Sequence, residues 1–99
     1  MIVARVMGNI WATRKEESLN GLKFLIVQPV DWDGRIAGAT FVAADKIGAG
    51  AGELVLVTRG SSARRALGPN DAPIDAMVTG IIDMVEVEKS RPAMAKAEV

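Results

Sequence analysis

The sequence predicts an all-β protein, a small five-stranded β-barrel with one short helix before the last strand. Three observations predict this fold class. Apolar and polar residues alternate with the period of two that is typical of strands. Turn-forming glycine, proline, asparagine and aspartate residues separate these segments. The length, 99 residues, suits one domain. We expect the barrel over residues 1–88 and a flexible tail over residues 89–99, which are small, charged and interrupted by Pro92.

The first strand is predicted over residues 2–13, because the even positions there are mostly apolar and the odd positions include arginine and asparagine. The polar segment 14–21 ends in Asn20-Gly21 and predicts an exposed loop. The second strand, residues 22–28, is apolar on both faces at its centre. This pattern suits a strand that the core covers on one face and a neighbouring subunit covers on the other.

The remaining elements are shorter. After a turn that follows Pro29, strands are predicted over residues 39–44 and 54–58. A helical turn is expected over residues 61–67, because serine can cap its start and a glycine-proline pair follows its end. The last strand is predicted over about residues 78–87, with a bulge or tight bend at the glycine of position 80.

The amino-acid composition limits the classes of function that the protein can have. Twelve basic and twelve acidic side chains give a formal net charge of zero, which removes the electrostatic case for nucleic acid or an anionic membrane as partner. The chain has no cysteine, so disulfides and thiolate chemistry are excluded. It also has no histidine, the commonest general base and transition-metal ligand, so we expect a binding or structural protein rather than an enzyme.

The start of the chain carries neither a long apolar segment nor a cleavage site, and no apolar run approaches about 18 residues. We therefore expect a cytoplasmic protein that binds no membrane.

The most informative segment is residues 45–53, a loop in which Gly48, Gly50 and Gly52 alternate with alanine. Glycine-rich loops bind phosphate where they open a helix, but this one ends in an acid and leads into a run with the composition of a strand. We expect a tight connection between strands. Our hypothesis is that these glycines permit close backbone packing at or near a subunit contact.

A second motif is Gly60-Ser61-Ser62-Ala63-Arg64. A serine nucleophile needs an activating base, and no histidine is present. The simplest interpretation is a helix start. A sharper hypothesis is that the guanidinium of Arg64 binds carboxylate or backbone oxygens of another subunit or of a neighbouring protein, with Ser61 and Ser62 beside it at the interface.

Two weaker signals are interpreted structurally. Asp31-x-Asp33-Gly34 resembles the start of a calcium loop but lacks the further acids, so we expect a plain turn and no metal site. The four aromatic residues are Trp11, Phe24, Trp32 and Phe41. The phenylalanines are expected to fill the core, whereas each tryptophan is either a core residue or an interface anchor. No cofactor is expected.

Several sequence motifs, in the same order along the chain, resemble those of one family, the pentameric vertex proteins of bacterial microcompartment shells of the carboxysome and ethanolamine-utilisation type. The resemblance covers residues 1 to about 87. The motifs are Gly8-Asn9-Ile10-Trp11-Ala12-Thr13-Arg14-Lys15, Leu19-x-Gly21-x-Lys23-Phe24-Leu25-Ile26-Val27-Gln28-Pro29, Ala43-Ala44-Asp45-Lys46-Ile47-Gly48-Ala49-Gly50, Gly60-Ser61-Ser62-Ala63-Arg64, and Pro73-Ile74-Asp75 followed by Gly80-Ile81-Ile82-Asp83.

The resemblance implies a barrel related to the oligonucleotide-binding fold, five copies of which form a ring that closes the corners of a shell built from hexameric tiles. It implies no reaction and no cofactor, and it places the protein in a microcompartment shell in the cytoplasm. Two alternatives remain. One is an oligonucleotide-binding barrel, which the zero net charge disfavours. The other is a ring-forming co-chaperonin, but no sequence motif matching the mobile loop of such a protein is found in the chain.

Overall fold

A computed structural model describes residues 1–12, 15–67 and 73–88 of the chain. Its strands are β1 (Ile2–Ile10), β2 (Lys23–Pro29), β3 (Phe41–Asp45), β4 (Leu54–Arg59) and β5 (Ala76–Ile82). Two short helices accompany them, a single 3₁₀ turn, η1 (Glu17–Leu19), and α1 (Ser61–Leu67). The tail expected over residues 89–99 lies outside the described residues.

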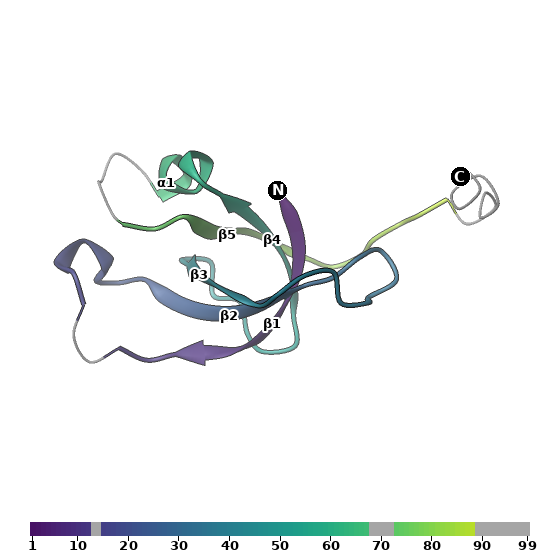
Figure 1. The fold of residues 1–99 in the computed structure, drawn as a ribbon, viewed down its shortest axis with the longest axis horizontal. Helices are drawn as coiled ribbons and strands as arrows, with labels where there is room; N and C mark the ends of the chain where they lie inside the picture. Colours follow the sequence, from purple (N-terminus) through teal and green to yellow (C-terminus); the bar gives the residue numbers. More distant parts are fainter. Residues whose placement is uncertain (13–14, 68–72, 89–99) are drawn as a thin grey trace.

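The strands form a closed barrel in the order β1-β2-β3-β5-β4, with β4 returning to β1 (Figure 1). Every neighbouring pair is antiparallel except β3 and β5, which are parallel and meet at the pair Ala44 and Met77. The predicted fold class, a five-stranded barrel with one short α-helix before the last strand, is confirmed.

Two bulges interrupt the ladders. Val6 pairs with Val27 but Gly8 pairs with Ile26, so Met7 is an extra residue in β1. In β5 the extra residue is Thr79, next to the glycine at which a bulge was predicted. Bulges increase local twist and bend a strand, which helps a barrel of only five strands to close.

The predicted bounds of three strands were wrong, since β3 begins at Phe41 rather than at residue 39 and the bounds of β1 and β5 also differ. β1 ends at Ile10, three residues early, because Ile10 pairs with Phe24 near the start of β2. β5 begins two residues early and ends at Ile82 rather than 87. Ile82 pairs with Leu54, the first residue of β4, so the alternating pattern that continues beyond Ile82 has no partner strand there.

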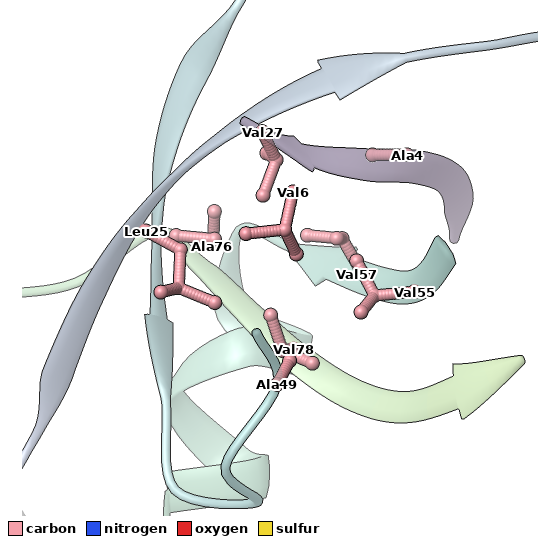
Figure 2. Close-up of a cluster of buried hydrophobic side chains, with 10 residues drawn as sticks. Ala4, Val6, Leu25, Val27, Ala49, Val55, Val57, Ala76 and Val78 are labelled. Carbon is pink, nitrogen blue, oxygen red and sulfur yellow. The ribbon is translucent and has the colours of Figure 1, made fainter. Parts of the chain in front are cut away.

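The core fills the barrel with small side chains. Ten buried residues from all five strands and one loop face one another inside it (Figure 2), and Ile2 and Phe41 pack against them. A second cluster, Ala44, Ala63, Ile74 and Met77, lies where α1 covers β5, with Phe24 packed against it. Both phenylalanines therefore contribute to the core as half-buried side chains.

Candidate functional site

The glycine-rich loop, residues 46–53, connects β3 to β4 and is fixed by Asp45, the last residue of β3. The Asp45 side chain is 1% exposed. Its carboxylate accepts hydrogen bonds from the backbone N–H groups of Ile47 at 2.9 Å, Gly48 at 3.0 Å and Ala49 at 2.8 Å. A buried carboxylate is costly unless such donors satisfy it, so these three bonds and the loop's conformation depend on each other.

The middle of the loop enters the barrel. Ala49 is fully buried and belongs to the core cluster, beside Val78 in Figure 2. The Lys23 ammonium of β2 donates to the carbonyl oxygen of Ala49 at 3.1 Å. The loop is therefore part of the barrel's interior rather than a free surface excursion.

The second half of the loop is tied to β1. Gly52 N–H donates to the Val6 carbonyl at 2.8 Å, and Val6 N–H donates to the Glu53 carbonyl at 2.9 Å. The Arg5 guanidinium donates to the Gly52 carbonyl at 2.8 Å. These bonds extend the β1–β4 ladder into the loop, next to the bulge at Met7.

The three glycines play different parts. Gly48 and Gly52 have φ angles of 102° and 88°, which side-chain-bearing residues rarely adopt. Gly50 has no such angle, and a Cβ there would lie 3.7 Å from the Glu53 carboxylate in ordinary contact. A Cβ at Gly48 or Gly52 would meet no atom of the chain within 4 Å. Within one chain, conformation explains Gly48 and Gly52, and nothing explains Gly50.

The loop is not arranged as a phosphate cradle. The N–H groups of Gly48, Gly50 and Gly52 donate respectively to the Asp45 carboxylate, to the Glu53 carboxylate at 2.6 Å and to the Val6 carbonyl. An anion site needs these donors free and pointing outward. The geometry therefore supports the interpretation as a tight connection between strands.

The second motif opens α1 at a different place. Gly60 has a φ of 67°, and its N–H donates to the Asp75 carbonyl at 2.7 Å, which joins the helix start to the chain entering β5. Ser61 and Ser62 are exposed, and Arg64 is the middle residue of the helix. α1 packs on β4 and β5, whereas the second half of the glycine loop is hydrogen-bonded to β1.

The tryptophans lie outside the core. Trp11 is 86% exposed and borders a small hollow with Lys15 and Lys23. Trp32 is 66% exposed and borders two other hollows, at the turn between β2 and β3. That turn is ordinary, because the Asp31 carboxylate accepts from the N–H groups of Asp33 and Arg35 within it. Two separated tryptophans do not form the stacking platform of a nucleic-acid-binding barrel.

In the described parts of the chain, no helix has the length and apolar character needed to cross a bilayer. These parts also contain no group of three or more acidic side chains placed to hold a metal ion.

The described part of the chain is thus a small closed β-barrel whose glycine-rich loop is hydrogen-bonded within the chain and whose two tryptophans are exposed. Comparison with known proteins gives the family. Residues 1–83 match the family model described as "Ethanolamine utilisation protein EutN/carboxysome", and the chain belongs to this family.

Individual relatives agree. The chain is 49% identical over 85 residues to the carboxysome shell vertex protein CcmL of Thermosynechococcus vestitus, covering 86% of each chain. The solved structure of Gloeobacter violaceus CcmL superposes with a TM-score of 0.81 at 45% identity, over 89% of this chain and 91% of that one. The pentameric microcompartment shell protein GrpN of Rhodospirillum rubrum gives a TM-score of 0.78 at 42% identity, over 88% and 100%.

The role of Asp45 is testable by Asp45→Asn, which removes the charge and places an amide group where N–H groups point. We expect the free energy of unfolding to fall by about 1–3 kcal/mol, because the amide keeps one oxygen and leaves at least one N–H donor of the turn without an acceptor. The matched control is Asp33→Asn in an exposed turn, where we expect a change within about 0.5 kcal/mol. Equal urea midpoints for the two variants contradict the role given to Asp45.

Proposed function

We propose that the protein is a structural shell component, five copies of which form a ring that caps a fivefold vertex of a bacterial microcompartment in the cytoplasm. The observation that carries the proposal is the likeness over nearly the whole described barrel to shell vertex proteins, one of them described as pentameric. The fold class and the zero net charge support it, since a neutral protein tolerates close packing of like copies.

The role is geometric. Hexameric tiles alone pack into flat sheets, and a closed polyhedron needs pentagonal units at its corners. We propose hexameric shell proteins as the partners of the ring and no reaction at any site. A nucleic-acid-binding function is less well supported, because the charge is balanced and the tryptophans border separate hollows.

The ring is tested by native mass spectrometry of the full chain at several concentrations. We expect a species of five times the 10.5 kDa chain mass. Coexpression with hexameric shell tiles should then give closed shells, and omission of the chain should leave sheets or open shells. A chain that stays monomeric alone and with tiles, and shells that close without it, both contradict the proposal.

We also propose that the glycine loop lies at or near the subunit contact, with Gly50 as its clearest indicator. At Gly50 a side chain introduces no unusual φ and its Cβ meets only an ordinary contact within the chain, so Gly50→Val should lower the melting temperature less than Gly48→Val does. If a neighbour packs there, the ring should dissociate at a protein concentration at least about tenfold higher, which is about 1.4 kcal/mol.

Gly48→Val is the informative comparison, because its φ of 102° strains any side chain and should lower the melting temperature whatever the contact. Unchanged pentamers in both variants would falsify this part of the proposal.

We further propose that Arg64 contacts another subunit or a tile, with Ser61 and Ser62 beside it. Arg64→Ala should reduce the yield of closed shells several-fold, and Arg64→Lys should restore it only in part, because an ammonium lacks the planar fork of donors. Closed shells at normal yield with Arg64→Ala contradict the role.

A further inference from the structure

One asparagine of the chain is followed directly by a glycine. Asn20-Gly21 lies in the turn between η1 and β2, at the tip of the β1–β2 hairpin (Figure 1). Both residues are exposed, and the Asn20 side chain makes no hydrogen bond with any of the described residues. Asparagine amides are among the chemically labile groups of proteins. The pair therefore offers a covalent change rather than a place to bind a ligand.

The backbone nitrogen of Gly21 is available to react. Its N–H donates to no group in the described part of the chain, although both neighbours are paired. Asn20 N–H donates to the Glu17 carbonyl at 3.0 Å, and Leu22 N–H donates to the Leu19 carbonyl at 3.2 Å. Gly21 has a φ of 87°, and a Cβ there would meet no atom within 4 Å. The space beside this nitrogen is therefore open.

The turn must open before the nitrogen can reach the asparagine side chain. Asn20 is extended, with a ψ of 138°, and rotation about that bond brings the Gly21 nitrogen toward Cγ. The two hydrogen bonds of the turn restrain this rotation, and among the described residues no long-range backbone bond holds Asn20 or Gly21. Exposed turns with only local bonds open at little cost in free energy. The fold therefore slows the rotation little.

We propose that Asn20 is a site of spontaneous deamidation. The Gly21 nitrogen loses its proton to a base in the solvent and bonds to Cγ of Asn20. The Cγ–Nδ2 bond then breaks, and Nδ2 takes up a proton and leaves as ammonia. The product is a five-membered succinimide ring. The inference concerns the folded chain and stands whether or not the ring of subunits forms.

Water opens the succinimide in one of two ways. Breaking the bond between the Gly21 nitrogen and Cγ gives aspartate. Breaking the bond between that nitrogen and the main-chain carbonyl carbon gives isoaspartate, in which the backbone runs through Cβ and Cγ. In sum, one amide and one water become one carboxylate and one ammonium ion, so no oxidant or reductant takes part.

Two other positions in the chain show what the reaction requires. Asn9 lies inside β1, its backbone pairs with β2, and a β-branched isoleucine crowds the following nitrogen. Asp33-Gly34 has the same spacing, but the Gly34 N–H is engaged within its turn at 3.0 Å. The Asp33 side chain is an ionised carboxylate, which resists a nucleophile more than a neutral amide does. We therefore expect deamidation at Asn20 and not at Asn9.

The modification changes both the charge and the packing of the turn. Either product adds a negative charge to a chain whose formal net charge is zero. Isoaspartate also lengthens the backbone by one CH₂ group. Leu19 and Leu22, on either side of the site, both pack against the second core cluster. The added group falls between these two anchored side chains, so isoaspartate should loosen the turn, whereas aspartate should not.

Incubation of the purified full chain at mildly alkaline pH, followed by peptide mapping with mass spectrometry, tests the site. Asn20 should lose its amide at a rate that rises with pH, because the reacting nitrogen must lose a proton. The rate should lie within about tenfold of that in the chain unfolded in guanidinium chloride, because an exposed turn opens easily. Asn9 should keep its amide in the folded chain.

The matched control is Asn20→Gln, which keeps an amide but needs a larger and slower-forming ring. It should melt like the natural chain, because the position is exposed, and should stay a single species in isoelectric focusing. An Asn20 amide that persists in the folded chain overturns the inference. Loss of the Asn9 and Asn20 amides at equal rates, or the same acidic species from Asn20→Gln, overturns it as well.

A second variant separates the charge from the added backbone group. Asn20→Asp carries the charge alone and should melt like the natural chain. The isoaspartate fraction of incubated protein, identified by an enzyme that methylates isoaspartate, should melt at a lower temperature. Equal melting of that fraction and of Asn20→Asp contradicts the loosening of the turn and leaves the site itself standing.

Discussion

The buried carboxylate of Asp45 is the interaction on which the rest of the structure depends. It directly follows Ala44, whose pairing with Met77 closes the barrel between β3 and β5. Its three hydrogen bonds turn the chain so that Ala49 enters the core and the loop reaches β1. Barrel closure, the entry of Ala49 into the core and the return of the chain to β4 thus all depend on Asp45. An amide there keeps only one acceptor oxygen for the three N–H donors.

Closure of the barrel changes the physical reason for which the chain associates with other copies. A five-stranded barrel with open edges needs a partner to cover its unpaired backbone groups. Here the strands join in a ring that closes between β3 and β5 through the single pair Ala44 and Met77, so most strand edges are paired within the chain. The reason lies in side chains instead, because Trp11, Trp32 and Met84 are largely exposed while the interior is filled mainly by valine and alanine. Large apolar groups outside a core of small ones are typical of a subunit.

The local sequence pattern was enough to predict the fold class, because the alternation of apolar and polar residues and the turn-forming residues are properties of short segments. It failed where the outcome depends on a partner strand. The alternation after Ile82 still has the character of a strand, yet β4 begins at Leu54 and offers no further pairing. The glycine loop was recognised as a connection, but its dependence on Asp45 involves a buried acceptor that no spacing rule identifies. The sequence also could not show whether the tryptophans are exposed. The alternating pattern places Trp11 in the first predicted strand but does not show what covers its side chain.

The residues that complete the barrel differ from those exposed on its outside, and this difference determines how assembly relates to folding. The core, the loop and the helix start obtain their hydrogen bonds and packing from the same chain, so the barrel needs no neighbour to become complete. Trp11, which follows β1, and Met84, which follows β5, are exposed and belong to neither core cluster. Ring formation is then the docking of finished barrels. Exposed side chains such as Trp11 can therefore change without altering the packing inside the barrel.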